Sequence, residues 1–145
     1  MKNTNKTKII FLDVDGVINC QYTTQRHGSY IGIDPYMALL VDRIVQATGA
    51  KIVLSSTWRL SEKDREIVKK FVDFIDITPD ISDYQRWDEV KAWLKDHPEV
   101  NRYAIIDDNW YNFPEDAEFV FKTQYIEGLT QGIADAVISY LNKEI

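Results

Sequence analysis

The chain has 145 residues, of which 45% are hydrophobic and 28% charged, and its formal net charge at pH 7 is -6. This composition is typical of a globular domain of ordinary size and excludes a wholly disordered chain. No apolar run approaches the roughly 18 residues of a membrane-spanning helix, and the acidic balance argues against a broad basic surface for long nucleic acids. The polar, basic N-terminus and the single cysteine, Cys20, lead us to expect a soluble, cytoplasmic protein without an internal disulfide.

Short apolar runs alternate with helical patterns along the chain. The first run is continuous and ends at the carboxylates of Asp13 and Asp15, as in a strand that is buried on both faces. A segment rich in Gly, Thr, Gln and Tyr follows, with a short hairpin expected around His27. The predicted strands cover residues 9–12, 50–54, 74–77, 103–106 and 119–121.

Four helices are predicted between and after these strands. Asp34 caps the first, which has Pro35 in its first turn and ends at Gly49. Ser61 with Asp64 reads as the cap of the second. The third covers residues 83–97, and Thr130 caps the fourth, whose apolar residues recur at helical spacing.

Strands that alternate with helices form right-handed crossovers. We therefore predict a three-layer α/β/α domain of Rossmann-like architecture, with a central, mostly parallel five-stranded sheet. We expect a flexible basic tail over residues 1–7 and a single domain over residues 8–145. Ligands of such sheets bind outside the carboxyl ends of the strands, at the point where the strand order reverses.

Acidic and hydroxyl residues follow three of the predicted strands. Asp13 and Asp15 lie two residues apart, so their side chains share a face; Ser55 ends a second strand, and Asp107 and Asp108 end a third. Each motif alone is often only a turn or a cap. Together, converging carboxylates predict a site for a hard cation, and Mg²⁺ fits because it takes carboxylates, waters and substrate phosphate.

These residues resemble motifs of the haloacid dehalogenase (HAD) superfamily of phosphohydrolases. Residues 11–17 (Phe-Leu-Asp-Val-Asp-Gly-Val) look like its first motif, residues 53–55 like its second and residues 105–108 like its acidic fourth motif. The third motif is a basic residue near the start of the helix before the acidic strand. Arg86 stands there, with Lys91 further along, and the sequence leaves open which of them it is.

The resemblance implies a role for each of these residues. Asp13 attacks phosphorus and becomes an aspartyl-phosphate, while Asp15 protonates the leaving oxygen and then activates water. Ser55 hydrogen-bonds a phosphoryl oxygen, and Arg86 or Lys91 neutralises its charge. Mg²⁺ is held by Asp13, the backbone carbonyl of Asp15 and either Asp107 or Asp108. An acid at position 15 favours phosphatases over the dehalogenating members.

The substrate side of the site has a closer resemblance. Residues 54–59, 86–94 and 128–130 are similar to small HAD domains, without a cap domain, of RNA-repair proteins and polynucleotide phosphatases. Residues 17–34 and 60–83 are too short for a separate cap, so an open site is expected. We expect Gly16, Ser56, Trp58 and Arg59 to contact the substrate. Trp58 can instead pack in the core, and Arg59 can instead form a surface ion pair.

Loop aromatics could form a platform for a base or sugar, or simply anchor their loops: Tyr22, Tyr30, Trp110, Tyr111 and Phe113. The residues thus favour a Mg²⁺-dependent phosphomonoesterase that acts on nucleotides or nucleic-acid ends. Two alternatives stay open. One is a small-metabolite phosphatase whose site is completed by oligomerisation, and the other is a non-catalytic module of the same fold that binds phosphate or protein.

Overall fold

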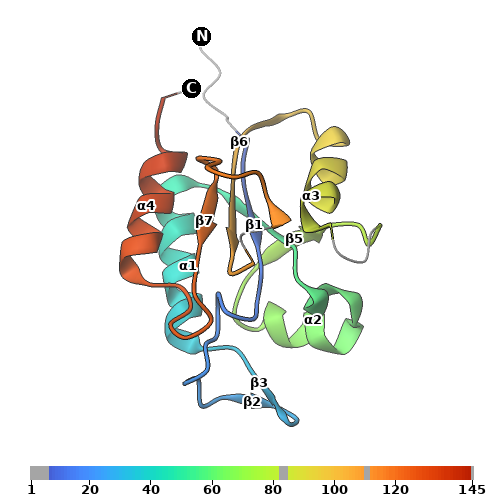
Figure 1. Ribbon diagram of the computed structural model, residues 1–145, viewed down its shortest axis with the longest axis vertical. Coiled ribbons are helices and arrows are strands. Elements are labelled where there is room, and N and C mark those ends of the chain that lie inside the picture. Colours follow the sequence, from blue (N-terminus) through green and yellow to red (C-terminus); the bar gives the residue numbers. More distant parts are fainter. Residues whose placement is uncertain (1–6, 82–84, 110–111, 145) are drawn as a thin grey trace.

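The computed structural model describes residues 7–81, 85–109 and 112–144 (Figure 1). Its centre is a five-stranded, fully parallel sheet in the order β5-β4-β1-β6-β7. The strands are β1 (Thr7–Leu12), β4 (Lys51–Leu54), β5 (Phe74–Ile77), β6 (Val100–Asp107) and β7 (Val120–Lys122). All five predicted strands are confirmed. The strand order reverses between β1 and β6, which makes the carboxyl ends of these strands the expected ligand site.

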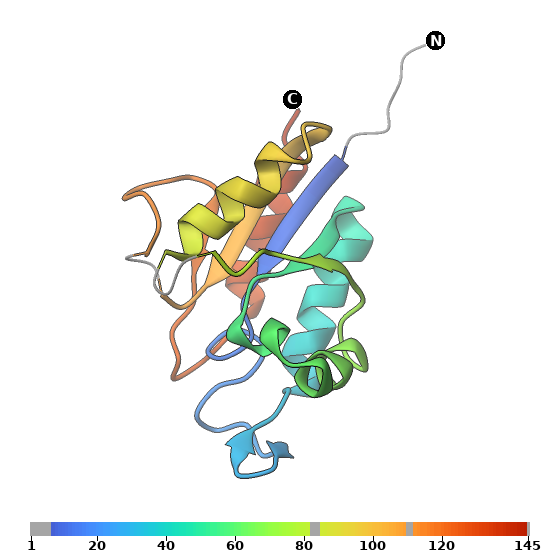
Figure 2. The ribbon, with the colours of Figure 1, turned by 90° about the vertical axis from the view of Figure 1, so that its right-hand side faces the viewer.

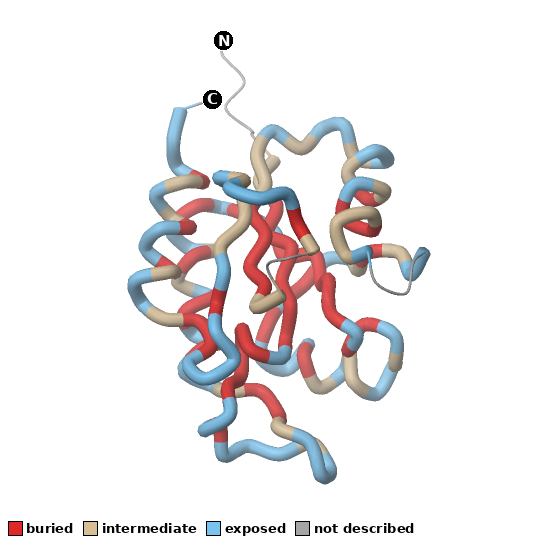
Figure 3. Tube along the Cα trace, viewed as in Figure 1, coloured by how far each residue is buried: buried red, intermediate tan, exposed pale blue. Residues whose placement is uncertain are grey.

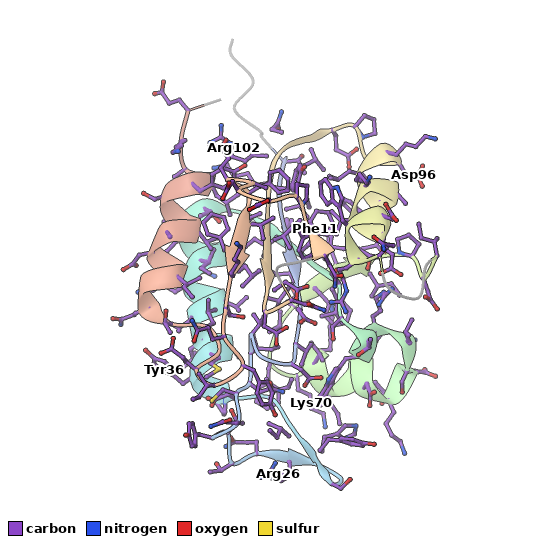
Figure 4. All side chains as sticks on the ribbon, in the orientation of Figure 1. Phe11, Arg26, Tyr36, Lys70, Asp96 and Arg102 are labelled. Atoms are coloured by element: carbon purple, nitrogen blue, oxygen red, sulfur yellow. The ribbon has the colours of Figure 1, made fainter. Side chains whose placement is uncertain are left out.

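Helices cover both faces of the sheet, which confirms the three-layer prediction (Figures 1 and 2). The helices α1 (Pro35–Thr48) and α4 (Gln131–Leu141) lie on one face, and α3 (Arg86–Lys95) lies on the other. Alternation along β1 explains both layers: Ile10 and Leu12 pack toward α1 and α4, whereas Ile9 and Phe11 pack toward α3. Phe11, near the centre of Figure 4, makes a T-shaped contact with Trp93, with 5.5 Å between the ring centres.

The helix ends follow the predicted capping chemistry. Asp34 accepts a hydrogen bond from the Tyr36 amide, and Thr130 accepts one from the Ile133 amide. Ser61 caps α2 (Glu62–Lys69) by accepting from the Asp64 amide. One further element was not predicted: a 3₁₀ turn, η1 (Thr57–Leu60), which joins β4 to α2.

The described segments between the strands contain no separate cap domain. Residues 13–34 add only a small hairpin, β2 (Arg26–His27) and β3 (Tyr30–Ile31), which confirms the expected turn at His27. This hairpin is largely exposed, in contrast to the buried strands of the sheet (Figure 3). Among the described residues, every helix falls short of the length and apolar character that crossing a bilayer requires.

Candidate active site

Backbone hydrogen bonds bring the ends of β1, β4 and β6 together. The amide of Asp13 donates to the carbonyl of Ile106 over 3.1 Å, and the amide of Ser55 donates to the carbonyl of Leu12 over 2.8 Å. These bonds extend the parallel ladders by one residue past the apolar runs. The polar residues that follow each strand therefore start from a shared, rigid edge.

Three carboxylates converge at this edge. Asp13, Asp107 and Asp108 each offer an oxygen atom, and these atoms lie within 4.8 Å of one another. Asp13 and Asp107 are buried, and Asp108 is partly buried. Burial, together with the neighbouring charge of Asp13, raises the pKa of Asp107 to about 8 and that of Asp108 to about 6. Burial also raises the pKa of Asp13, against the effect of the Arg86 guanidinium.

This donor set fits a hard divalent cation. Its atoms are all carboxylate oxygens, which Mg²⁺ prefers. Burial and then the charge of Asp13 raise the pKa values of Asp107 and Asp108, and a bound cation would favour their ionised forms. The carboxylate of Asp15 is not a member of this group among the described residues. According to the resemblance, the group of Asp15 that binds the metal is its backbone carbonyl and not its carboxylate.

Arg86 supplies the positive charge at the cluster. It is the first residue of α3, and its Nη1 lies 3.1 Å from Oδ1 of Asp13 and 3.3 Å from Oδ2 of Asp107; it also donates to the carbonyl of Ser55. Lys91 points elsewhere, because its Nζ pairs with Asp88 at 3.4 Å and about half of its side chain is exposed. Of the two basic candidates, the structure thus brings only Arg86 to the carboxylates.

The hydroxyl of Ser55 is buried without a partner. Ser55 is 1% exposed, and its Oγ is the one buried side-chain nitrogen or oxygen in the described part of the chain that lacks a hydrogen bond. Leaving a buried hydroxyl unpaired costs about 1–3 kcal/mol. Arg86 donates both to the backbone carbonyl of Ser55 and to Asp13, so Ser55 lies at the same edge of the sheet as the carboxylates.

Asp15 is exposed, and two donors hold its carboxylate. Asn19 Nδ2 donates to Oδ1 over 2.9 Å, and Trp58 Nε1 donates to Oδ2 over 3.2 Å. Asn19 is fully buried and also accepts from the amide of Gly16 and donates to the carbonyl of Gly32. The sequence reasoning missed Asn19. Its position three residues after Gly16 in an irregular segment, where Asn often bonds to backbone, was the available signal.

Gly16 lets Asp108 approach the end of β1. Its φ is +80°, and a Cβ atom added there would lie 2.2 Å from Oδ2 of Asp108. Its amide donates to Asn19, and its carbonyl accepts from the Thr123 hydroxyl over 2.6 Å. Both backbone groups of Gly16 therefore have protein partners, and its role in this structure is to leave space.

The other predicted substrate residues face inward. The Ser56 hydroxyl accepts from the amide of Trp58 and caps η1. Arg59 is 3% exposed and donates to Glu89 over 2.9 Å and to three backbone carbonyls. It is thus a buried ion-pair residue instead of a surface one. Trp58 is buried beside Asp15, so it packs in the core and also borders the site.

The loop aromatics differ in how far they are buried. Phe113 is buried against the α3 face of the sheet, whereas Tyr22 and Tyr30 are exposed. Trp110 and Tyr111 lie outside the described residues.

A cavity of about 640 Å³ opens beyond Asp15. The hairpin, η1, α2 and the segment before α4 all contribute to its wall, chiefly through Asp15, His27, Tyr30, Trp58, Asp64 and Tyr125. His27 and Asp64 meet across it with an Nε2–Oδ1 distance of 2.7 Å. No sequence signal could have joined these two residues, because they are 37 positions apart on different elements.

Comparison with known proteins agrees with this architecture. No curated protein and no solved structure gave a significant match to the chain. Residues 9–134, which include every strand of the sheet from Ile9 onward and the carboxylate cluster, match the family described as "HAD domain in Swiss Army Knife RNA repair proteins". Because this match covers most of the 145 residues, the chain belongs to that family of HAD domains.

Proposed function

We propose that the protein is a Mg²⁺-dependent phosphatase that hydrolyses phosphomonoesters through an aspartyl-phosphate on Asp13. Family membership supports a hydrolase of the phosphatase type. The observation that carries the proposal is the buried, unpartnered hydroxyl of Ser55. A hydroxyl in this state is suited to donate to an oxygen that arrives with the substrate, and Arg86, which donates to the backbone carbonyl of Ser55, also donates to Asp13.

In the first step, a carboxylate oxygen of Asp13 forms a bond to phosphorus while the bond between phosphorus and the leaving oxygen breaks. Asp15 gives its proton to that oxygen, so the product leaves as an alcohol. Ser55 and Arg86 donate hydrogen bonds to the phosphoryl oxygens, whose charge is spread in the transition state. Asn19 and Trp58 fix the carboxylate of Asp15 toward the leaving group.

In the second step, water attacks phosphorus and the acyl-phosphate bond to Asp13 breaks. Asp15, now ionised, takes the proton of the attacking water, which regenerates the acid for the next turnover. Asp13 keeps the electron pair of the broken bond and is again a carboxylate, and inorganic phosphate leaves. Asp13, Asp107 and Asp108 would hold Mg²⁺, which when bound neutralises negative charge around the phosphoryl group.

The test uses p-nitrophenyl phosphate, whose leaving group needs no proton. We expect phosphate release that requires Mg²⁺, stops with EDTA and is lost in Asp13→Asn. In Asp15→Asn we expect one burst of p-nitrophenol followed by slow turnover, with phosphorylated Asp13 found by mass spectrometry of the quenched protein. Asp96→Asn is the matched control, because Asp96 is exposed at the other end of α3 from Arg86 (Figure 4).

Two outcomes would contradict the proposal. Full activity in Asp13→Asn would exclude that residue as the nucleophile. No release of phosphate from any phosphomonoester, together with no binding of Mg²⁺, would favour a non-catalytic module of the same fold. Activity only in an oligomeric fraction from gel filtration would instead favour a metabolite phosphatase completed by a second chain.

A further inference from the structure

The cavity beyond Asp15 lies where a leaving group would go. Asp15 lines this cavity, and along the chain it lies two residues after Asp13 at the end of β1. In the proposed reaction Asp15 protonates the leaving oxygen, so the rest of the leaving group extends away from Asp13 past Asp15. The wall of the cavity therefore contacts the part of the substrate that distinguishes one phosphomonoester from another.

Aromatic side chains from three separate segments line this cavity. Trp58 comes from η1, Tyr30 from the hairpin and Tyr125 from the segment before α4. Tyr30 is 74% exposed and Tyr125 is 47% exposed, although large aromatic surfaces are normally buried. Rings gathered around one opening suit a flat ring of the ligand, and stacking on such a ring contributes about 1–3 kcal/mol.

The charge of the cavity is negative. Asp15 and Asp64 carry its carboxylates, and none of its lining residues in the described part of the chain is Lys or Arg. His27 is the single lining residue that can become a cation, and it already pairs with Asp64 at 2.7 Å. A leaving group with its own phosphate would face these carboxylates without a counter-charge, and phosphate backbones need Lys and Arg contacts for affinity.

The cavity is built before the substrate arrives. The His27–Asp64 pair ties the hairpin to α2, and the His27 ring lies 5.4 Å from the Trp58 ring. Its volume of about 640 Å³ falls within the usual range for a small ligand, about 300–1,000 Å³. A preformed pocket lowers the entropy cost of binding a small, rigid ligand.

We propose that this cavity binds an uncharged nucleoside as the leaving group, so that the preferred substrate is a nucleoside monophosphate with no second phosphate. The inference rests on the proposed phosphatase function and adds its substrate class. Tyr30 and Tyr125 hold the base, and Asp64 accepts hydrogen bonds from sugar hydroxyls while it repels further phosphate groups.

Steady-state kinetics on four substrates test this assignment: adenosine monophosphate, adenosine 3′,5′-bisphosphate, glycerol phosphate and a phosphorylated oligonucleotide. We expect kcat/KM for the monophosphate to exceed that for the bisphosphate and the oligonucleotide by about tenfold or more. In Asp64→Asn this preference over the bisphosphate should shrink several-fold. In the double variant Tyr30→Ala/Tyr125→Ala, KM should rise at least about fivefold more for adenosine monophosphate than for glycerol phosphate.

Tyr36→Ala is the matched control, since Tyr36 is another exposed tyrosine (55%), on α1, and does not line the cavity. A preference for the oligonucleotide or the bisphosphate, or equal KM changes on both substrates, would overturn the inference while leaving the phosphatase proposal intact. A readout without turnover separates the two: adenosine should shift the indole N–H NMR signal of Trp58, assigned with Trp58→Phe. If no substrate releases phosphate, that shift still supports the nucleoside pocket, and its absence refutes it.

Discussion

The indole Nε1 of Trp58 donates a hydrogen bond to Oδ2 of Asp15 over 3.2 Å. Trp58 follows β4, whereas Asp15 follows β1, so this bond joins two loops at the carboxyl edge of the sheet. Because Asn19 holds the other carboxylate oxygen, Asp15 has a defined orientation although it is exposed. Trp58 is thus a positioning residue for the acid that the proposed mechanism requires.

Trp58→Phe should lower kcat for p-nitrophenyl phosphate by about tenfold, because Asp15 must still activate water in the second step of the proposed reaction. A hydrogen bond to a charged group contributes about 1.5–3 kcal/mol, and phenylalanine keeps most of the packing while it removes the donor. Trp93→Phe is the matched control, because Trp93 is also buried and its Nε1 donates to Asp76 over 2.8 Å on the α3 side of the sheet. Equal kcat values in the two variants would show that Trp58 does not orient Asp15.

Much of the fold could be predicted because its determinants are local. Strands of a parallel sheet are buried on both faces, so each appears in the sequence as a continuous apolar run, and β1 and β6 show this clearly. Capping residues such as Asp34 and Thr130 act within three positions of their own helix. Asp13, Asp107 and Asp108 could be placed together because parallel strands end at one edge.

The orientation of residues after the strands could not be predicted. Trp58 and Arg59 lie in η1, and its tight turn directs both side chains into the interior, where Arg59 meets Glu89 thirty positions away. The pairing of His27 with Asp64 likewise depends on how the hairpin and α2 pack together. Such contacts are tertiary, so sequence spacing carries no signal for them. The roles assigned to the site residues stay predictions.

Arg86 contacts the carboxylate cluster and Lys91 does not, which leads to a second prediction about the basic residue of the site. Arg86→Met should lower kcat/KM by roughly 100-fold to 1,000-fold, as expected when a donor that stabilises transition-state charge is removed. Lys91→Met should stay within about twofold of the unchanged protein, because the Lys91 ammonium is exposed and pairs with Asp88. Both are measured on p-nitrophenyl phosphate at saturating Mg²⁺. A larger loss in Lys91→Met than in Arg86→Met would reverse the assignment of the basic residue.

Gly16→Ala should weaken Mg²⁺ binding as well as stability. The added methyl group would meet the Asp108 carboxylate at 2.2 Å, so that side chain has to move away from Asp13. Gly49→Ala shares the positive φ, at +74°, but its Cβ has open space, so it carries only the backbone strain, about 1–3 kcal/mol. Calorimetric titration with Mg²⁺ should show lower affinity for Gly16→Ala alone. If both variants bind Mg²⁺ equally well, Asp108 does not contribute to the metal site.

Without a divalent cation, thermal stability should fall as pH rises from 5 to 8. The pKa of Asp107 is about 8 and that of Asp108 about 6 in the folded protein, above the ordinary value of 3.8, so between these limits the folded state binds more protons than the unfolded state. The free energy of unfolding then decreases with pH, and the contribution of these groups is lost once pH passes the folded pKa values.

Mg²⁺ should oppose this loss, because it binds only the ionised carboxylates. Melting temperatures measured in EDTA and in Mg²⁺ should therefore differ more at pH 8 than at pH 5. Asp107→Asn removes the carboxyl group whose pKa is raised further, so in this variant both the fall in melting temperature with pH in EDTA and the gain from Mg²⁺ should be smaller. A gain from Mg²⁺ that is as large at pH 5 as at pH 8, or unchanged in Asp107→Asn, would place the cation away from this cluster.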